Sequence, residues 1–487
     1  MRFTGKIVAL LMVVCLIVGA AGSYAAINVF DLGQSSESEI HLSDEDGESF
    51  DLQKVEAAAD VISEKYFQKV DKKDLYNGAI RGMIESLDDP FSTYMDSKEA
   101  KQFSQQLSSS FSGIGVKVQM INGAMTIMTT MEGTPADKAG LRPQDQIVTV
   151  NGDSIKGMSL YKAISKIKGK NGTTVELGIK RKGVSEPINF DIDRGKIKVE
   201  TVKSRVITKE KEPIGYIEIT SFNENTDEAF KEHLQQLESQ DIKGLLIDVR
   251  SNPGGYLESV LNIGNILLPK GSTIVKTQDR AGQTQSYKVE SGEGKSYPMA
   301  LLINKGSASA SEILAGALKE AGGYPVIGTQ SFGKGTVQTL AAQFKDSSEI
   351  KLTVRKWLTP KGHWIHEKGI EPTNKFKQSA MYYTHPTSIK EGKVLGYDDT
   401  NDKVSNIQKM LKGLGYSPGR TDGYYSKDTA DAVRAFQKVN DLEVNGSVDQ
   451  KTASKLEMKV LNAIDQPEND MQLQQGVNTL LDKINQG

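Results

Sequence analysis

The fold of this chain is decided by a strongly apolar run that passes directly into a run of small residues. The segment reads Met299-Ala300-Leu301-Leu302-Ile303-Asn304-Lys305-Gly306-Ser307-Ala308-Ser309-Ala310-Ser311-Glu312-Ile313. Its first five residues predict a buried strand, and the small residues that follow predict the beginning of a helix. A nucleophile gains most at such a position, because the amides and dipole of a helix N-terminus favour developing negative charge. Taken alone, the three alternating serines are more typical of an ordinary helix cap.

Similar apolar runs lie on both sides of this segment and alternate with helical patterns. They occupy residues 214–220, 244–249, 325–328 and 350–354. Strands that alternate with helices predict an α/β core. Catalytic groups are then expected in loops at the strand ends.

Two of these loops carry residues that suit acyl transfer. Lys334 lies between two glycines, and burial of a lysine makes it a usable base for a serine. Gln338 follows four residues later and offers an amide that could orient the amine. The turn Asn252-Pro253-Gly254-Gly255 can expose amides for an oxyanion hole, although alone it is more typical of an ordinary tight turn. A phosphate loop is disfavoured because its glycine and lysine spacing is missing.

A run of short β-branched segments with glycine turns begins at Phe111. Three motifs occur in order, namely Gly113-Ile114-Gly115-Val116, Gly133-Thr134-Pro135-Ala136 and Ile147-Val148-Thr149-Val150-Asn151-Gly152. This succession resembles a PDZ domain. The resemblance implies that the amides of Ile114, Gly115 and Val116 bind a terminal carboxylate, and that the next strand pairs with the peptide.

An internal repeat lies near the C-terminus. The phrase Asp/Asn-Gly followed by Thr after five residues occurs at 422–429 and again at 445–452, each time leading into a helix. The unit resembles a peptidoglycan-binding domain of the three-helix type, which makes peptidoglycan an expected partner. A plain helical bundle with glycine turns is the alternative.

The N-terminus predicts export. Arg2 and Lys6 precede an uncharged stretch at residues 7–22, and acidic residues follow at 44–48, so the body is expected outside the cytoplasm. A retained membrane anchor is favoured over a cleaved signal. Cys15 is the chain's one cysteine and lies inside this stretch, so a disulfide is not expected. The formal net charge of -2 gives no reason to expect nucleic acid, and the five histidines form only a weak metal motif.

Together, the serine, lysine and Pro-Gly-Gly segments resemble the C-terminal processing peptidases, or tail-specific proteases, of peptidase family S41. The resemblance implies Ser309 as nucleophile, Lys334 as general base and Gln338 as the group that positions the lysine. It also implies an oxyanion hole from the amide of Ala310 and an amide of Gly254 or Gly255, and a gating role for a basic PDZ residue, here Lys168. No cofactor or metal is expected.

The expected fold class is multidomain α/β plus β, with a core of the ClpP/crotonase type behind the PDZ domain. The expected units are a signal or transmembrane segment, an acidic linker, an N-terminal helical region, the PDZ domain, the protease core, a second linker, the peptidoglycan-binding domain and a helical tail. They span 1–30, 31–50, 51–95, 96–190, 191–383, 384–396, 397–460 and 461–487.

The expected function is a serine endopeptidase that cleaves exported proteins near accessible C-termini, gated by the PDZ domain and held near the cell wall. A homodimer, built in part by the N-terminal helices, is the expected assembly. A catalytically silent scaffold that binds peptides and wall polymer is the alternative. A wall hydrolase is disfavoured, because no zinc or paired-carboxylate machinery is evident.

Overall fold

The computed structural model describes residues 52–121, 123–181, 183–390 and 392–486. The predicted export segment and acidic linker lie outside them. Within the described part of the chain, no helix is both long and apolar enough to cross a membrane.

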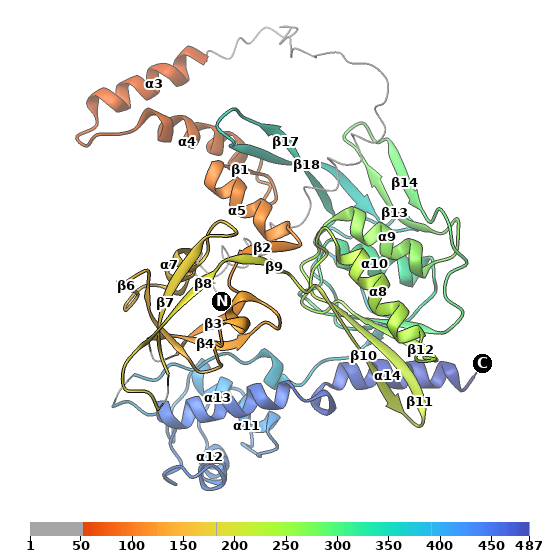
Figure 1. Cartoon of the computed structure of the whole chain (residues 1–487). Helices are drawn as coiled ribbons and strands as arrows, with labels where there is room; N and C mark the ends of the chain where they lie inside the picture. Colours follow the sequence, from red (N-terminus) through yellow and green to blue (C-terminus); the bar gives the residue numbers. More distant parts are fainter. Residues whose placement is uncertain (1–51, 122, 182, 391, 487) are drawn as a thin grey trace.

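The chain first forms a helical region that is tied to the core. Figure 1 shows helices α3 and α4 extending away from the rest of the molecule. A short strand that follows them pairs antiparallel with strand β18 of the core, at Thr93 opposite Lys351. The elements are α3 (Leu52–Lys65), α4 (Lys72–Glu85), β1 (Thr93–Met95) and α5 (Ser97–Leu107). This region is therefore part of the core sheet before the chain enters the next unit.

The second unit is a β-sheet flanked by two short helices and joined to the core by a ribbon. Strands β2 (Ser110–Gly113) and β9 (Gly195–Lys198) form that antiparallel ribbon. The sheet has the order β3-β4-β5-β7-β8, with β6 at its side. Its elements are β3 (Val116–Ile121), β4 (Ala124–Thr130), α6 (Pro135–Lys138), β5 (Gln146–Val150), β6 (Asp153–Ser154), α7 (Leu160–Ile167), β7 (Thr174–Lys180) and β8 (Ile188–Asp193).

The core contains the predicted α/β arrangement. Its main sheet has the order β10-β11-β12-β15-β16-β19, and every neighbouring pair except β10-β11 is parallel. These strands are β10 (Val202–Lys209), β11 (Glu212–Ile219), β12 (Gly244–Asp248), β15 (Met299–Ile303), β16 (Val326–Gly328) and β19 (Asn374–Lys375). Both faces of this sheet are apolar. Because each face must be buried, other elements have to cover the sheet on both sides.

Different helices cover the two faces. One face packs against α8 (Thr226–Glu238), α9 (Leu257–Leu267) and α10 (Ala310–Glu320). The other packs against α14 (Met471–Ile484), the last helix of the chain. The approach of α14 is close at Gly476, where a Cβ atom would lie 2.9 Å from the Leu246 side chain.

A second core sheet stands beside the first. It has the order β1-β18-β13-β14, and β17 also pairs with β18. Its remaining strands are β13 (Thr273–Gln278), β14 (Thr284–Lys288), β17 (Thr336–Gln343) and β18 (Glu349–Leu358). Strand β17 begins directly after the predicted base, so the two sheets meet at the candidate site.

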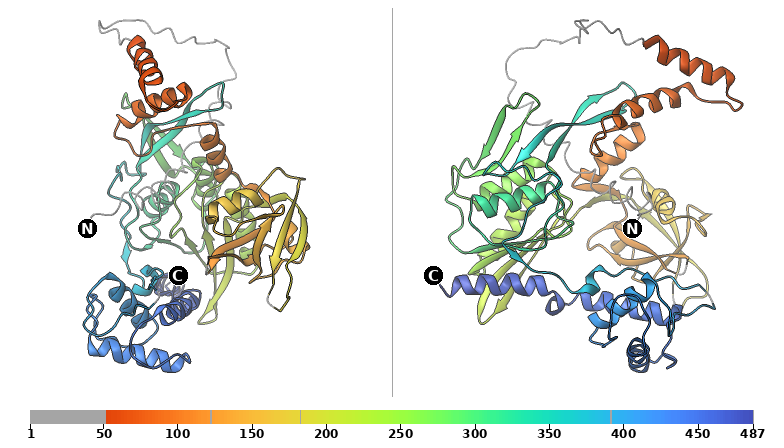
Figure 2. Two further views of the ribbon diagram at one scale, coloured as in Figure 1. Left: turned by 90° about the vertical axis from the view of Figure 1, so that its left-hand side faces the viewer. Right: turned by 180° about the vertical axis from the view of Figure 1, so that it is seen from behind.

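The C-terminal unit is a helical bundle with its own apolar core around Val404, Phe436 and Leu456. Its helices are α11 (Asp402–Gly413), α12 (Lys427–Val439) and α13 (Gln450–Ile464), with the 3-10 turns η1 (Ala380–Tyr383) and η2 (Pro467–Asn469) at its borders. In Figure 2, α13 leads through a short connection into α14, which runs beneath the core.

Candidate active site

Ser309 occupies a strained turn between strand β15 and helix α10. Its φ of 54° and ψ of -113° are unusual for a residue with a side chain, and it is the N-cap of the helix. The residue is 7% exposed. It lines a small cavity with Gly255, Leu257, Ala310, Ile313, Thr336, Val337 and Trp357. Such a turn presents a side chain at the end of a parallel sheet, where a nucleophile is reachable.

The neighbouring serines are committed to backbone contacts. The Ser307 hydroxyl donates to the Val249 carbonyl at 2.8 Å, and the Ser311 hydroxyl donates to the Asn252 carbonyl at 2.9 Å. Both residues are fully buried. They therefore fasten the serine segment to the loop after β12, and Ser309 is the member of the three that faces the cavity.

Glu312 joins the serine segment to the lysine segment. One carboxylate oxygen accepts hydrogen bonds from the amides of Ser309 and Lys334, each at 2.8 Å. The other accepts from the Ser331 hydroxyl and the Gly333 amide, each at 2.6 Å. Burial raises the pKa of Glu312, and these four hydrogen bonds oppose that shift. The sequence reasoning missed this residue, although a glutamate three residues after a helix cap is a known capping signal.

Lys334 is 1% exposed, and its ammonium nitrogen lies 4.9 Å from the centre of the Phe91 ring. Phe91 belongs to the loop between α4 and β1, so the N-terminal region supplies a wall beside the lysine. The backbone carbonyl of Lys334 accepts a hydrogen bond from the Trp357 indole at 2.7 Å.

Gln338 is buried but is not joined to Lys334. Its amide nitrogen donates to the hydroxyls of Thr336 and Thr353, at 2.9 and 3.0 Å. Among the described residues, the buried Oε1 of Gln338 has no hydrogen-bond partner. A buried amide oxygen without a donor costs free energy.

Trp364 and His366 hold the backbone of Gly335, the residue that follows Lys334. The Gly335 carbonyl accepts from the Trp364 indole at 2.9 Å, and its amide donates to Nδ1 of His366 at 3.3 Å. The Trp364 and His366 rings stack at 5.3 Å. In the sequence the histidines form only a weak metal motif, so the contact of His366 with the lysine segment was not predicted. Both rings also line a cavity of about 660 Å³ beside Thr336.

The Pro-Gly-Gly turn is held against the loop that follows β11. A Cβ atom on Gly255 would lie 1.8 Å from the Phe222 carbonyl oxygen, so only glycine fits. Phe222 donates to the Gly254 carbonyl at 2.8 Å and accepts from the Tyr256 amide at 2.7 Å. The Gly254 amide donates to Oδ1 of Asn252 at 2.8 Å.

Arg250, in the same segment, makes an unexpected long-range ion pair. It binds Asp248 at the end of strand β12 and Asp470 at the start of α14, with shortest distances of 2.6 and 2.7 Å. Burial acts to lower the pKa of Arg250, but the two carboxylates raise it above its usual value. The end of the chain is thus fastened next to the turn beside Ser309.

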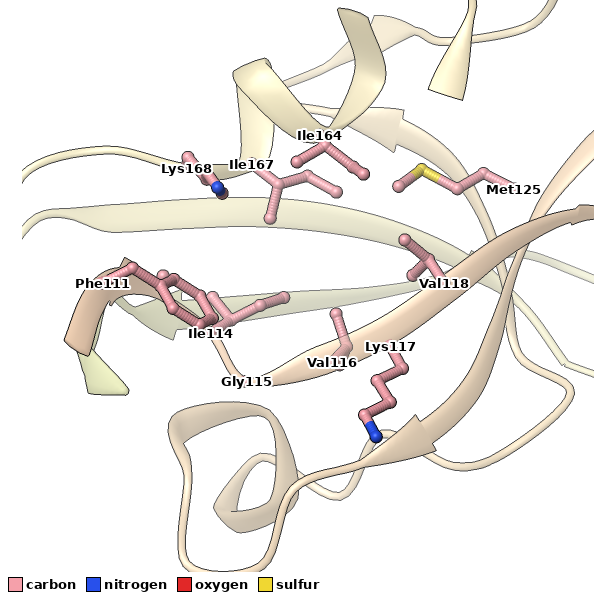
Figure 3. A pocket seen from close by; sticks show the side chains of 11 residues that line it. Phe111, Ile114, Gly115, Val116, Lys117, Val118, Met125, Ile164, Ile167 and Lys168 are labelled. Carbon is pink, nitrogen blue, oxygen red and sulfur yellow. The ribbon is translucent and has the colours of Figure 1, made fainter. Parts of the chain in front are cut away.

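The second unit carries a groove of about 310 Å³. Figure 3 shows Val116 and Val118 of β3 on one side and Ile164 and Ile167 of α7 on the other. Gly115 lies at the entrance of β3 with a φ of 81°. The predicted residues Ile114, Gly115 and Val116 therefore line one groove together with Lys168. The Lys168 ammonium lies 5.3 Å from the Phe111 ring centre, a contact within the PDZ-like unit and its ribbon.

Family models match the chain in four places. Peptidase family S41 matches residues 213–376, the PDZ domain 112–192, a peptidoglycan binding domain 400–456, and the activating protease CtpB N-terminal domain 16–99. The predicted fold class is confirmed: a PDZ domain precedes an S41 core, and a helical region follows it. These matches define a serine peptidase with a PDZ domain.

Curated relatives match over nearly the whole length. Carboxy-terminal processing protease CtpB of Bacillus subtilis (strain 168) is 43% identical over 98% of this chain and 99% of its own. Carboxy-terminal processing protease CtpA of the same strain is 40% identical over 94% and 95%. The chain belongs to the carboxy-terminal processing proteases of peptidase family S41. A solved structure, the photosystem II D1 C-terminal processing protease, is 28% identical and covers 66% of this chain and 92% of its own, with a TM-score of 0.42.

Proposed function

We propose that this chain cleaves exported proteins near their C-termini with a Ser309–Lys334 dyad. The observation that carries the proposal is the bridge made by Glu312, which accepts from the amides of Ser309 and Lys334 with one oxygen. A single buried carboxylate thus holds the two loops that carry the nucleophile and the base. Lys334 is almost fully buried, as a lysine that acts as a neutral base must be.

In the proposed reaction the neutral amine of Lys334 takes the proton of the Ser309 hydroxyl as its oxygen attacks the scissile carbonyl. The oxyanion is stabilised by the amides of Ala310 and Gly255. Gly255 is preferred over Gly254 because the Gly254 amide already donates to Asn252. Lys334 then protonates the leaving amine, and water hydrolyses the acyl-enzyme by the reverse proton transfers.

The proposal includes a resting state controlled by the PDZ domain. Lys334 rests on the Phe91 ring, while the Oε1 atom of Gln338 lacks a donor. In the active state the amine of Lys334 donates to the Oε1 atom of Gln338 and takes up the Ser309 proton. A contact between the ribbon that carries the PDZ domain and the core supports PDZ control. The Ser108 carbonyl, just before ribbon strand β2, accepts a hydrogen bond from the side-chain amide of Asn223 at 3.3 Å. Asn223 adjoins Phe222, which holds the Pro-Gly-Gly turn.

The location and assembly are also proposed. The match to a peptidoglycan binding domain supports association with the cell wall. The exposed apolar side chains of the N-terminal hairpin, including Val61 of α3 at 56% and Phe67 of the turn after it at 83%, support a homodimer through this hairpin. The predicted membrane anchor falls outside the described residues and stays part of the proposal.

The dyad is tested by turnover of an unfolded protein. Ser309→Ala and Lys334→Ala are each expected to abolish cleavage, and both should keep the circular dichroism spectrum and melting temperature of the unmodified chain. Measurable cleavage by either variant would contradict the dyad.

The same assay tests the proposed control by the PDZ domain. A saturating free peptide with an apolar C-terminus should change kcat, and an unchanged kcat would contradict PDZ control.

A further inference from the structure

A second buried lysine lies beside the candidate site. Lys351, on strand β18, is 1% exposed, as Lys334 is. Its ammonium nitrogen lies 5.0 Å from the centre of the Phe103 ring of helix α5. Each lysine therefore rests on an aromatic ring that the N-terminal region supplies. Two buried ammonium groups in one apolar environment are costly, because each loses its hydration and each repels the other.

The strand register places Lys351 on the face that holds the lysine-orienting glutamine. Thr353 pairs with Gln338 across β17 and β18, and Lys351 pairs with Leu340. Residues two apart on a strand share a face, so Lys351 and Thr353 point to the same side. Thr353 accepts the hydrogen bond of the Gln338 amide nitrogen. Lys351 is thus part of the layer that surrounds the proposed base.

The charged groups that act on Lys351 are Lys334 and Asp89. Burial and, to a smaller extent, the charge of Lys334 lower the pKa of Lys351 to about 7, although the charge of Asp89 acts to raise it. On the neighbouring strands β1 and β17, the residues opposite Lys351 are Thr93 and Leu340, which are both uncharged. Protonation of Lys334 and Lys351 at the same time is therefore unfavourable at neutral pH.

Asp89 is the carboxylate whose charge acts on Lys351. It accepts from the Ser92 hydroxyl at 2.6 Å and from the Phe91 amide at 3.0 Å. Burial acts to raise the pKa of Asp89, but hydrogen bonds from Ser92, Thr353 and Phe91 hold it below its usual value, so it is ionised. The charge of Asp89 therefore stabilises the protonated form of Lys351.

We propose that Lys351 is a positioning residue whose positive charge keeps the neighbouring Lys334 in the neutral, proton-accepting form. Repulsion between two charges is reciprocal, so the proton on Lys351 disfavours a proton on Lys334. Lys334 is then available to take the Ser309 proton at neutral pH. This inference rests on the proposed dyad.

The test is the pH dependence of kcat/KM for a peptide substrate. Lys351→Met keeps the length and apolar stem of the side chain but removes the charge. Lys334 should then keep its proton to higher pH, so the rising limb should move up by about one pH unit. Activity at pH 7 should fall about tenfold and recover at high pH. The reason is that, at a pH below the rising limb, the fraction of neutral Lys334 falls about tenfold when its pKa rises by one unit.

Two further variants separate charge from packing. Lys351→Arg keeps a permanent charge, and its rising limb should lie at or below that of the unmodified chain. Lys345→Met removes an exposed lysine from the β17–β18 turn and should leave the profile unchanged. An Lys351→Met profile that is unshifted, or lowered equally at every pH, would overturn the inference. It would leave the dyad intact, because Ser309→Ala and Lys334→Ala test that separately.

Discussion

At the scale of single residues, the site depends on a carboxylate that does not take part in the proposed proton transfer. Glu312 satisfies four donors from the two loops that carry Ser309 and Lys334. A carboxylate can accept from all four, whereas an amide presents its own N–H groups to two of them. These donors replace the water that burial removes from the carboxylate oxygens.

Glu312→Gln should therefore loosen both loops. We expect kcat to fall about 10- to 100-fold, since small displacements of reacting groups carry costs of this size. The melting temperature should also fall, because two buried donors lose their acceptor. The measurements are peptide turnover and thermal unfolding, with Glu228→Gln on the exposed face of α8 as the matched control. A variant with unchanged kcat would show that the loops hold their places without this carboxylate.

At the scale of elements, helix α14 closes the core from a position far along the chain. Its residues Leu473, Val477 and Leu480 are buried against the sheet. Its first turn is held by Asp470, which binds Arg250 beside the Pro-Gly-Gly turn. Removal of this helix would expose an apolar face of the central sheet next to the site.

The attachment of α14 should be sensitive to acid. Burial acts to raise the pKa of Asp470, but hydrogen bonds and the charge of Arg250 hold it below 3.8. A carboxylate with a lowered pKa stabilises the fold above its unfolded pKa and loses that contribution as pH falls through the folded value. Asp470→Asn should lower stability at pH 7 by about 2–4 kcal/mol, somewhat less than a fully broken buried pair because Asp248 still binds Arg250.

The loss of stability of Asp470→Asn below pH 3.8 should be shallower than that of the unmodified chain, because the variant has no charge to lose there. Thermal unfolding between pH 7 and pH 2.5 measures this, with the exposed Asp482→Asn on the same helix as control. Parallel curves for Asp470→Asn and the unmodified chain would contradict the role of the ion pair.

At the scale of the whole molecule, the N-terminal hairpin leaves apolar side chains uncovered. Val61, Ile62, Phe67 and Met83 are all more than 40% exposed. The chain should form a dimer at micromolar concentration in light scattering. Val61→Asp combined with Phe67→Glu should make it monomeric without lowering its melting temperature, because charges at these positions oppose only association. Lys54→Glu on the same helix should stay dimeric, and a monomeric unmodified chain would refute this interface.

The proposed binding to the cell wall is tested with the whole molecule, because α13 and α14 link the C-terminal bundle to the core. Full-length Ser309→Ala should sediment with insoluble peptidoglycan, and soluble peptidoglycan fragments should release it by competition. A chain that stays in the supernatant would contradict the proposed attachment. Use of the inactive variant keeps self-cleavage from confusing the result.

Much of this architecture was predictable because its signals are local. The strand at residues 299–303, the glycine turns of the PDZ domain and the repeated phrases of the C-terminal bundle all follow from periodicity and turn chemistry. The ordered motifs also indicated the family. The roles of Ser309, Lys334 and Gln338 remain proposals, and the structure adds their surroundings.

What the sequence by itself determined is the class of enzyme, its PDZ, S41 and peptidoglycan-binding units, and the short segments that are proposed to carry the chemistry. Only the tertiary structure decided how these segments meet. It engaged the hydroxyls of Ser307 and Ser311 and turned Ser309 toward the cavity, and it brought Lys351 into the charge environment of Lys334. It also tied Arg250 to Asp470, 220 residues later. The physical reason is that burial, charge coupling and hydrogen-bond partners depend on distances in space, which local sequence patterns do not encode.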